Sequence, residues 1–354
     1  MTSSPRSRPA LAGMLAAALL LAACSSGSPS ASDGGDLTGS VFVSGSSTVE
    51  PISLAVAEDF AAQQPEVDIS VEGPGTSDGF ALFCAGESDV SDASRAIKQA
   101  EIDTCAENDI EFIELYIAID GLSVLTSVHN DAVECLSFTD LWALLGPDAA
   151  GNGSNWSDAD QLAAETFDAT SGEFGEIHAP YPDAPINITA PGEESGTFDS
   201  FIEIVLNPVG GALAVEEITS TPNYQASGDD NVIIQGLTGT ADSPDTLGWV
   251  GYAYYEENTD VVKALEVDKG DGCVAPTVDT IASGEYPIAR PLYFYVNAAG
   301  AEENAALAAF VDFYLSDAGR ASIAEVGYVD IPDEEWQATL DTWESRTTGT
   351  QVGG

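Results

Sequence analysis

The chain has 354 residues, and its 59 Asp and Glu residues outnumber 9 Lys and Arg residues, so the formal net charge at pH 7 is −50. Such an acidic surface excludes nucleic-acid binding through clustered basic side chains and disfavours direct docking on anionic lipid. Low lysine with high Asp and Glu is typical of solvation in a salty setting, where screening over about 8 Å or less weakens self-repulsion.

The N-terminus has the pattern of an export signal. Arg6 and Arg8 precede an apolar run, 11–23, which is too short to span a bilayer as a mature helix. The run ends in Leu-Ala-Ala-Cys24, which resembles a bacterial lipobox. We therefore expect residues 1–23 to be removed and Cys24 to be lipidated, by palmitate among other chains, on the outer face of the cell membrane. A plain signal peptide with an incidental cysteine is the alternative.

The first part of the mature chain repeats a strand, a turn and a helix. The pattern predicts an α/β fold with a mainly parallel sheet, whose strand ends carry ligands at one face. Two near-continuous apolar strands follow, with Asp120-Gly121 between them. The predicted strands are 41–43, 67–71, 89–90, 112–119 and 122–128, and the predicted helices are 51–63, 78–84 and 97–107.

The middle and end of the chain repeat the pattern of strand, turn and helix less regularly. The interval 152–175 is a polar excursion, and 347–354 is predicted to be a disordered tail. The remaining predicted helices are 138–145, 198–206, 305–315 and 319–326, and the remaining strands are 186–189, 249–250, 262–267 and 292–296.

This order predicts two lobes that the chain crosses twice. A flexible Ser- and Gly-rich tether over 24–37 leads into lobe I, which comprises 38–121 and 289–346. Lobe II comprises 122–288. Two crossings make a hinge with a cleft that closes around a small ligand.

Four cysteines remain after Cys24, and an even number in an exported chain favours disulfides. Three pairings are possible. We predict Cys84–Cys105, which closes a short loop, and Cys135–Cys273, which closes a long one. A zinc site is disfavoured because no pair has metal-ligand spacing, and His129 and His178 are isolated.

Between Ser25 and Val262 the only cations are Arg95 and Lys98, which makes their turn the best place for an anion. Hydroxyl-rich turns also precede three predicted helices, where free backbone N–H groups favour negative charge. Ordinary N-caps and solvated surface cations are the competing interpretations. These turns are Ser46-Ser47-Thr48, Thr76-Ser77 and Ser195-Gly196-Thr197.

Five segments, in this order, resemble the motifs of the periplasmic phosphate-binding protein of the high-affinity phosphate ABC transporter. The similarity extends over about residues 40–330, and the combination is more specific than any single motif. The segments are 44–51 (SGSSTVEP), 75–80 (GTSDGF), 91–95 (SDASR), 194–199 (ESGTFD) and 251–258 (GYAYYEEN).

The resemblance implies a two-lobed type II periplasmic-binding-protein fold, with two mainly parallel sheets joined by a two-crossing hinge. It implies a monomer without a cofactor or metal that binds inorganic phosphate and delivers it to membrane permease subunits. The phosphate contacts that it implies are Ser46, Ser47, Thr48, the Val49 amide, Thr76, Ser77, Asp92, Ser195, Gly196 and Thr197.

The chain departs from the family at one position. Many members carry an arginine four residues before the serine of the Ser-Gly-Thr turn, and here that residue is Pro191. Arg95 could supply the guanidinium instead, as in a subgroup with Ser-Asp-Ala-Ser-Arg.

Asp92 is the expected selectivity residue. Phosphate near neutral pH keeps a proton that a carboxylate can accept, whereas sulfate has none to donate. Asp92 therefore argues against sulfate and molybdate, while arsenate stays open. A helix cap or a partner of Arg95 is the alternative role.

Two other classes of protein compete with this interpretation. An exported phosphatase-like enzyme would need a nucleophile beside a base, and no histidine lies near a serine-rich turn. A structural or adhesive lipoprotein would have no ligand cleft. We expect no enzymatic activity.

Overall fold

The computed structural model describes residues 37–147, 154–193, 195–211, 223–241 and 245–351. The predicted signal peptide, Cys24 and almost all of the tether lie outside these ranges. None of the helices in the described ranges combines the length and apolar character needed to cross a membrane.

One mixed sheet organises the described chain, in the order β2-β1-β3-β11-β4-β8-β6-β7, with β9 also paired to β4. Strands β2 and β3 run parallel to β1, and β7 and β8 run parallel to β6. The pairs that join these two groups, through β11 and β4, are antiparallel. Each group is parallel, as the prediction of two mainly parallel sheets requires, and the antiparallel pairs join the two groups into one mixed sheet rather than two separate ones. The strands are β1 Gly39–Gly45, β2 Val67–Glu72, β3 Val90–Ala93, β4 Phe112–Ser127, β6 Asn187–Pro191, β7 Tyr224–Ser227, β8 Thr246–Gly251, β9 Val262–Ala264 and β11 Ala289–Asn297.

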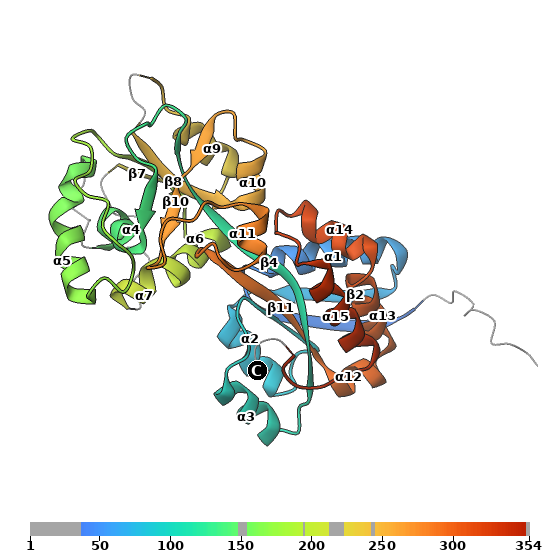
Figure 1. Cartoon of the computed structure of the whole chain (residues 1–354). Helices are drawn as coiled ribbons and strands as arrows, with labels where there is room; N and C mark the ends of the chain where they lie inside the picture. The colour runs from blue at the N-terminus through green and yellow to red at the C-terminus, as the bar shows by residue number, and fades with distance from the viewer. Residues whose placement is uncertain (1–36, 148–153, 194, 212–222, 242–244, 352–354) are drawn as a thin grey trace, which may run out of the picture. The chain divides into compact units, whose positions relative to one another are not determined.

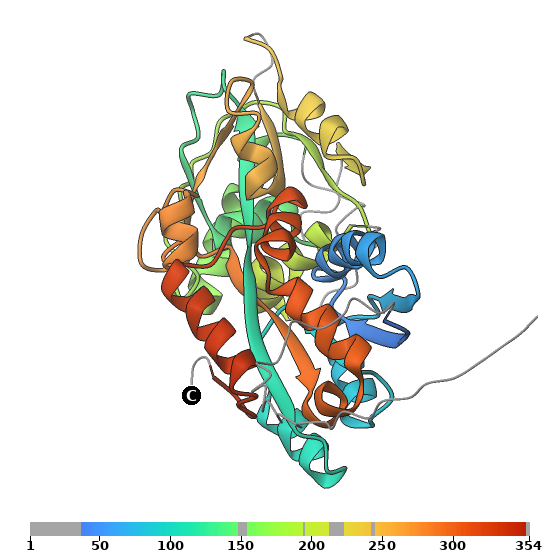
Figure 2. The ribbon, with the colours of Figure 1, turned by 90° about the vertical axis from the view of Figure 1, so that its right-hand side faces the viewer.

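The long strand β4 explains the difference. The sequence predicts a break at Asp120-Gly121, but the strand continues through both residues (Figures 1 and 2). Asp120 lies opposite Arg290, and Gly121 lies opposite Ala289, in the ladder with β11. From Leu122 onward β4 pairs instead with β8 and β9. A charged residue is tolerated inside this strand because its partner strand supplies the opposite charge.

Helices cover both faces of the first group of strands. Helices α1, α13 and α14 contact one another over Val41 and Val43, whereas α2 and α3 cover the opposite face around Phe80 and Tyr295. Pro51 stands at the start of α1, where its missing N–H costs little. The helices in this part are α1 Glu50–Gln63, α2 Thr76–Cys84, α3 Gln99–Glu107, α12 Ala298–Glu303, α13 Ala305–Tyr314, α14 Asp317–Glu325 and α15 Asp333–Glu344.

The middle of the chain adds further helices and a two-stranded parallel sheet of β5, Cys135–Ser137, and β10, Glu266–Asp268. Helix α4, Phe138–Leu145, has the predicted bounds. Helix α5, Asp160–Thr170, lies in the predicted polar excursion, because burial of Ala163 and Thr166 stabilises a helix with little apolar periodicity. The other elements are η2 Trp156–Ala159, α6 Gly196–Phe201, η3 Ile202–Leu206, α7 Asn207–Gly210, α9 Asp230–Leu237, α10 Tyr252–Glu256 and α11 Val278–Ala282.

The C-terminus is bound more firmly than the sequence predicts. Helix α15 contacts β4 and lies beyond the last predicted helix. After it, Gly349 forms a bridge with Ile113, and the Gln351 amide donates to Glu114 Oε1 at 2.7 Å. The prediction of a disordered tail is therefore wrong for 347–351.

The structure contains both predicted disulfides. Cys84–Cys105 joins α2 to α3, and both of its cysteines are buried. Cys135–Cys273 joins β5 to the loop that follows β10, across 138 residues of sequence.

Candidate functional site

The first hydroxyl-rich turn connects β1 to α1. The Ser46 amide donates to the Asp92 carbonyl at 2.9 Å, which holds the turn against the end of β3. Ser46 Oγ accepts from the Thr48 amide at 3.2 Å, and the Ser46 carbonyl accepts from the Val49 amide at 3.1 Å. The Val49 amide, a predicted anion donor, is therefore engaged within the turn.

The second turn connects β2 to α2 and meets the end of β3. Thr76 Oγ1 lies 3.0 Å from Ser94 Oγ and accepts from the Ser94 amide at 3.2 Å. Gly75 precedes the helix with a φ of 112°, a conformation that glycine adopts without strain. These contacts bring Thr76, Ser77 and Ser94 to one place.

Arg95 lies beside this turn but is not free. Its Nη1 and Nη2 donate to the two carboxylate oxygens of Glu101 at 2.9 and 2.7 Å. Nη2 also donates to Ser77 Oγ at 3.0 Å. The guanidinium is thus held in a bidentate pair that positions it next to the second turn.

Arg290, the second residue of β11, carries the second guanidinium of the site. Its Nε donates to Asp120 Oδ2 at 3.3 Å and its Nη1 to Glu203 Oε2 at 2.6 Å. Nη2 donates to Thr48 Oγ1 at 2.7 Å and also to Ser200 Oγ. Arg290 therefore joins β4, the first turn and α6.

The third turn, at the start of α6, packs directly on the first. A Cβ placed on Gly196 would lie 3.1 Å from the Ser47 carbonyl oxygen, so a glycine suits this close approach. Thr48 Oγ1 and Ser200 Oγ are 3.2 Å apart. The Ser195 hydroxyl caps the helix by accepting from the Thr197 amide at 3.3 Å.

Two adjoining cavities, of about 150 and 550 Å³, lie among these turns. We call them together the two-arginine cleft, because Arg290 lines both and Arg95 lines the larger. Thr197 does not line this cleft but a separate cavity of about 300 Å³ with Asp120 and Tyr328. The residues that line the two-arginine cleft are Ser46, Ser47, Thr48, Gly73, Pro74, Gly75, Thr76, Ser77, Asp78, Ser94, Arg95, Lys98, Asp199, Glu203, Ile204 and Arg290.

Asp92 is placed differently from the prediction. It has no exposed surface, it does not line the cleft, and neither carboxylate oxygen has a hydrogen-bond partner among the described residues. It lies opposite Phe294, which packs on Tyr314 of α13, so its side chain is on the face that α1 and α13 cover. The strand-end residue that reaches the cleft is Ser94. Asp92 is therefore not among the residues that line the two-arginine cleft, and its contact with the anion stays a prediction.

The cleft contains carboxylates as well as cations. Asp199 lines it from α6 and Glu203 from η3, the helix that follows. Burial raises the pKa of the Asp199 carboxyl, Glu203 raises it further, and Arg290 lowers it. The cleft thus offers hydroxyl and guanidinium donors beside a carboxyl group that can exchange a proton.

Sequence reasoning missed four contributors, Ser94, Asp199, Glu203 and Arg290. One signal was available for Arg290. It is a single cation inside an apolar β run, and Asp120 is one of two acids, with Glu114, inside another. Opposite charges that interrupt two core strands favour a cross-strand pair.

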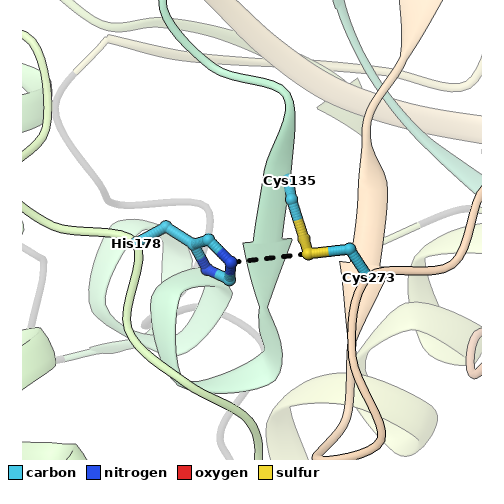
Figure 3. Close-up of side chains that lie close together, drawn as sticks. All are labelled: Cys135, His178 and Cys273. Atoms are coloured by element: carbon cyan, nitrogen blue, oxygen red, sulfur yellow. Dashed lines mark hydrogen bonds between the residues drawn. A yellow bond between two sulfur atoms is a disulfide. The ribbon is translucent and has the colours of Figure 1, made fainter.

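The structure offers one further group of potential ligand atoms among the described residues. Cys135, His178 and Cys273 place their sulfur and ring nitrogen atoms within 4.8 Å of one another (Figure 3). The two sulfurs are bonded to each other, and so neither is the thiolate that zinc requires.

Comparison with known proteins agrees with this geometry. The family profile described as a PBP superfamily domain matches residues 28–318. Protein SphX from Synechocystis is 36% identical over 343 residues, which cover 97% of this chain and 92% of that protein. Phosphate-binding protein PstS from Staphylococcus epidermidis is 32% identical over 329 residues, which cover 93% and 90%. The crystal structure of a "possible phosphate binding protein" from Planctomyces limnophilus shares 34% identity with a TM-score of 0.73, over 87% of this chain and 99% of that one.

The buried carboxyl of Asp92 yields a prediction on stability. Burial raises the pKa of this carboxyl, the Ser53 hydroxyl lowers it and Glu50 raises it, and together they bring the pKa to about 8. The unfolded chain ionises near pH 4, so the free energy of unfolding should fall between about pH 4 and 8 as the native state retains the proton. Asp92→Asn should remove up to about 4 kcal/mol of this dependence between pH 5 and 8.

Urea unfolding across this pH range measures the effect. Asp103→Asn, at an exposed position of α3, is the matched control and should keep the wild-type slope. An unchanged slope for Asp92→Asn would mean that Asp92 is not the protonated group.

Proposed function

The chain belongs to the PBP superfamily, and on that premise we propose that it binds inorganic phosphate outside the cytoplasm and delivers it to a phosphate ABC transporter. The observation that carries the proposal is the convergence of hydroxyl-rich turns from β1–α1 and β2–α2 on a cleft lined by Arg95 and Arg290. Hydroxyl donors and a planar guanidinium match the oxygens of a tetrahedral oxyanion.

We propose that phosphate contacts Ser46, Ser47, Thr48, Thr76 and Ser77, as the sequence predicts, together with Ser94. These residues, except the exposed Ser77, are buried or half-buried at the cleft, where few competing water contacts remain. Ser195, Gly196, Thr197 and the Val49 amide stay candidates that would join after a local rearrangement.

Arg290 takes the place of the arginine that the family resemblance leads one to expect at Pro191. It reaches the first turn and α6 simultaneously, and its side chain is only 10% exposed. Arg95, which lines the larger cavity with Arg290, supplies the second guanidinium. Each guanidinium is paired with a carboxylate, so the two arginines contribute directed N–H donors to the cleft rather than a net positive charge.

In this proposal the two predicted lobes move relative to each other. They are lobe I, 38–121 with 289–346, and lobe II, 122–288. The change of pairing partners along β4 at Leu122 supports that division. Contacts between α6 and the first turn are then the ones that open when ligand leaves.

Selectivity for phosphate over sulfate is assigned to Asp199 in place of Asp92. A carboxylate at the cleft can accept a hydrogen bond from the proton that phosphate retains. Sulfate carries no such proton, so the carboxylate would face the sulfate oxygens without a hydrogen bond. Arsenate is protonated as phosphate is, and binding assays must include it.

We propose that the protein has no enzymatic activity. The described cleft contains no histidine, and its serines contact hydroxyls, amides or a guanidinium rather than a base. Turnover of a chromogenic phosphate ester would instead support the phosphatase-like alternative.

Titration calorimetry tests the ligand and the role of Arg95 together. We expect one phosphate per chain and a weaker affinity for sulfate and molybdate. Arg95→Ala should lower phosphate affinity by about 10- to 150-fold, because a hydrogen bond to a charged group contributes about 1.5–3 kcal/mol.

Three controls make the Arg95 result specific. Lys98→Ala should have a smaller effect, and Arg320→Ala, whose guanidinium pairs with Asp330 and Asp333, should have none. Glu101→Gln releases the guanidinium and should retain binding. Equal losses for Arg95→Ala and Arg320→Ala would contradict the assignment, and a folded wild type that gives no heat with phosphate would refute the function.

Asp199→Asn tests the origin of selectivity. Asparagine keeps an acceptor oxygen and adds N–H donors that sulfate can use, so the ratio of phosphate to sulfate affinity should fall by about tenfold, close to 1.4 kcal/mol. Calorimetry at fixed ionic strength measures both affinities. Asp92→Asn serves as the comparison, since the structure places it away from the cleft, and an identical ratio in wild type and Asp199→Asn would rule out this role.

We propose further that Cys24 carries a lipid that holds the protein on the outer face of the membrane. Cys24→Ser should move the protein from the membrane fraction to the medium or periplasm while phosphate affinity stays unchanged, because the tether is Ser- and Gly-rich. Fractionation followed by mass spectrometry of the N-terminal peptide gives the answer. A wild-type N-terminal peptide without lipid would contradict the anchor.

A further inference from the structure

The two disulfides have different surroundings. Cys84 and Cys105 are both 1% exposed between α2 and α3. Cys273 is exposed in the loop after β10, whereas Cys135 is buried in β5. An external thiol can therefore reach the Cys273 sulfur but not the other three.

His178 faces the exposed sulfur. Its Nε2 lies 3.5 Å from Cys273 Sγ, and the same nitrogen is within 4.8 Å of Cys135 Sγ (Figure 3). A ring nitrogen at this position can hold the proton that a departing thiolate needs.

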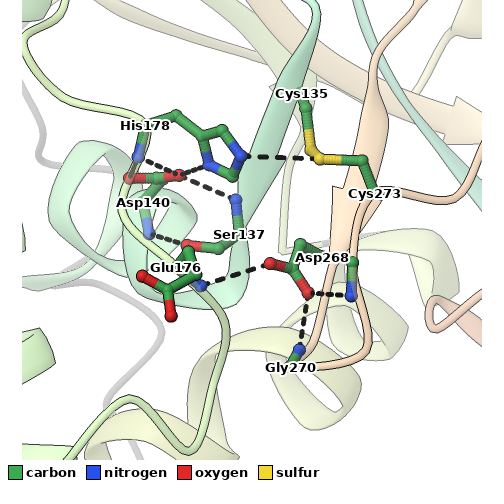
Figure 4. The surroundings of a disulfide bond; sticks show 9 residues. Cys135, Ser137, Asp140, Glu176, His178, Asp268, Gly270 and Cys273 are labelled. Atoms are coloured by element: carbon green, nitrogen blue, oxygen red, sulfur yellow. Dashed lines mark hydrogen bonds and ion pairs between the residues drawn. A yellow bond between two sulfur atoms is a disulfide. The ribbon is translucent and has the colours of Figure 1, made fainter.

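A buried carboxylate fixes the imidazole. Asp140 Oδ2 lies 2.7 Å from His178 Nδ1, and the Asp140 side chain has no exposed surface (Figure 4). The amides of Ser137 and His178 donate to the same carboxylate, and so does the Tyr181 hydroxyl. This network orients the ring with Nε2 toward the disulfide, independently of the ring's own charge.

The loop that carries Cys273 is also held in place. Asp268 Oδ1 accepts from the Gly270 and Gly272 amides at 2.6 and 2.9 Å, and Oδ2 accepts from the Glu176 amide at 3.2 Å. These bonds connect the loop to the segment that bears His178 (Figure 4). The sulfur and the ring are thus positioned by one shared set of contacts.

We propose that Cys273 is a thiol-exchange site, at which a small neutral or cationic thiol forms a mixed disulfide with the aid of His178. The incoming thiolate attacks Cys273 Sγ and forms a new S–S bond, while the Cys135–Cys273 bond breaks. The electron pair leaves on Cys135 Sγ, which takes the proton from Nε2 of the imidazolium. The products are a mixed disulfide, a Cys135 thiol and a neutral imidazole, and no external oxidant or reductant is consumed.

The charges around His178 determine the preferred thiol and the pH range. The hydrogen bond that the His178 ring donates to Asp140 raises the pKa of His178, burial lowers it, and Asp140, Asp268 and Glu176 raise it by their charge. Lys269, the residue after Asp268, lies over the Phe138 ring. Because the surroundings and the whole chain are acidic, an anionic thiol is repelled and a cationic one is attracted.

The experiment uses the oxidised protein and cysteamine as the probe, with iodoacetamide quenching and peptide mass spectrometry. We expect the adduct on Cys273, a carbamidomethyl group on Cys135, and an intact Cys84–Cys105 bridge. At low ionic strength, 2-mercaptoethanesulfonate should react more slowly than cysteamine after both rates are corrected for thiolate content. An adduct on Cys135, or equal reaction of the two disulfides, would overturn the proposal.

His178→Gln should slow the exchange by about tenfold or more, the lower range of general acid catalysis. His129→Gln, the other histidine, is the matched control and should react as wild type does. Asp140 keeps its Ser137, Tyr181 and backbone partners in the variant, and phosphate titration verifies the fold. An unchanged rate in His178→Gln would refute proton donation.

The wild-type pH profile gives a test without a variant. The thiolate-corrected rate constant should be highest where His178 is protonated and should fall as pH rises through its pKa. The profile of His178→Gln should be flat over the same range. A flat wild-type profile would also refute proton donation.

Discussion

The ion pair between Asp120 and Arg290 is the constraint on which the rest of the structure depends. Its side chains are 6% and 10% exposed, so the cost of burying each charge is offset only while the partner is present. The register of β4 and β11 places them opposite each other, and Arg290 then reaches Thr48 and Ser200. Removing one partner of such a pair typically costs about 3–5 kcal/mol, whereas the pair itself contributes little net stability. The main effect of the pair is to fix the position of the Arg290 guanidinium.

This arrangement explains how a strongly acidic chain can offer an anion site. Hydroxyl groups from the turns can donate hydrogen bonds without adding charge. The two guanidinium groups are fixed in position by ion pairs with Glu101, Asp120 and Glu203. Preorganised donors need no rearrangement when the ligand arrives. Salt screens the repulsion of the distant acids, while the short contacts inside the cleft are screened much less.

The case of Asp92 and Ser94 shows where sequence reasoning loses precision. Both residues lie in one short motif, and the motif marks the correct strand end. Side chains two residues apart in a strand point to the same face, but β3 ends at Ala93, so the sequence does not show that Ser94 departs from the direction of Asp92. Here α1 and α13 cover the face that holds Asp92, and the chain beyond β3 brings Ser94 to Thr76.

The sequence by itself determined the local elements and the class of protein. Apolar periodicity located α1, α3 and α4, cysteine spacing predicted both disulfides, and the turn motifs identified the family, because each of these signals lies within a few residues. Only the tertiary structure decided that β4 continues through Asp120, that Arg290 reaches Thr48 across 242 positions, and that 347–351 pairs with the start of β4. Those features arise from pairing between segments that are distant in the sequence. A local sequence pattern does not specify which distant segment becomes the partner, because charge and register are matched only when the two segments meet in the fold.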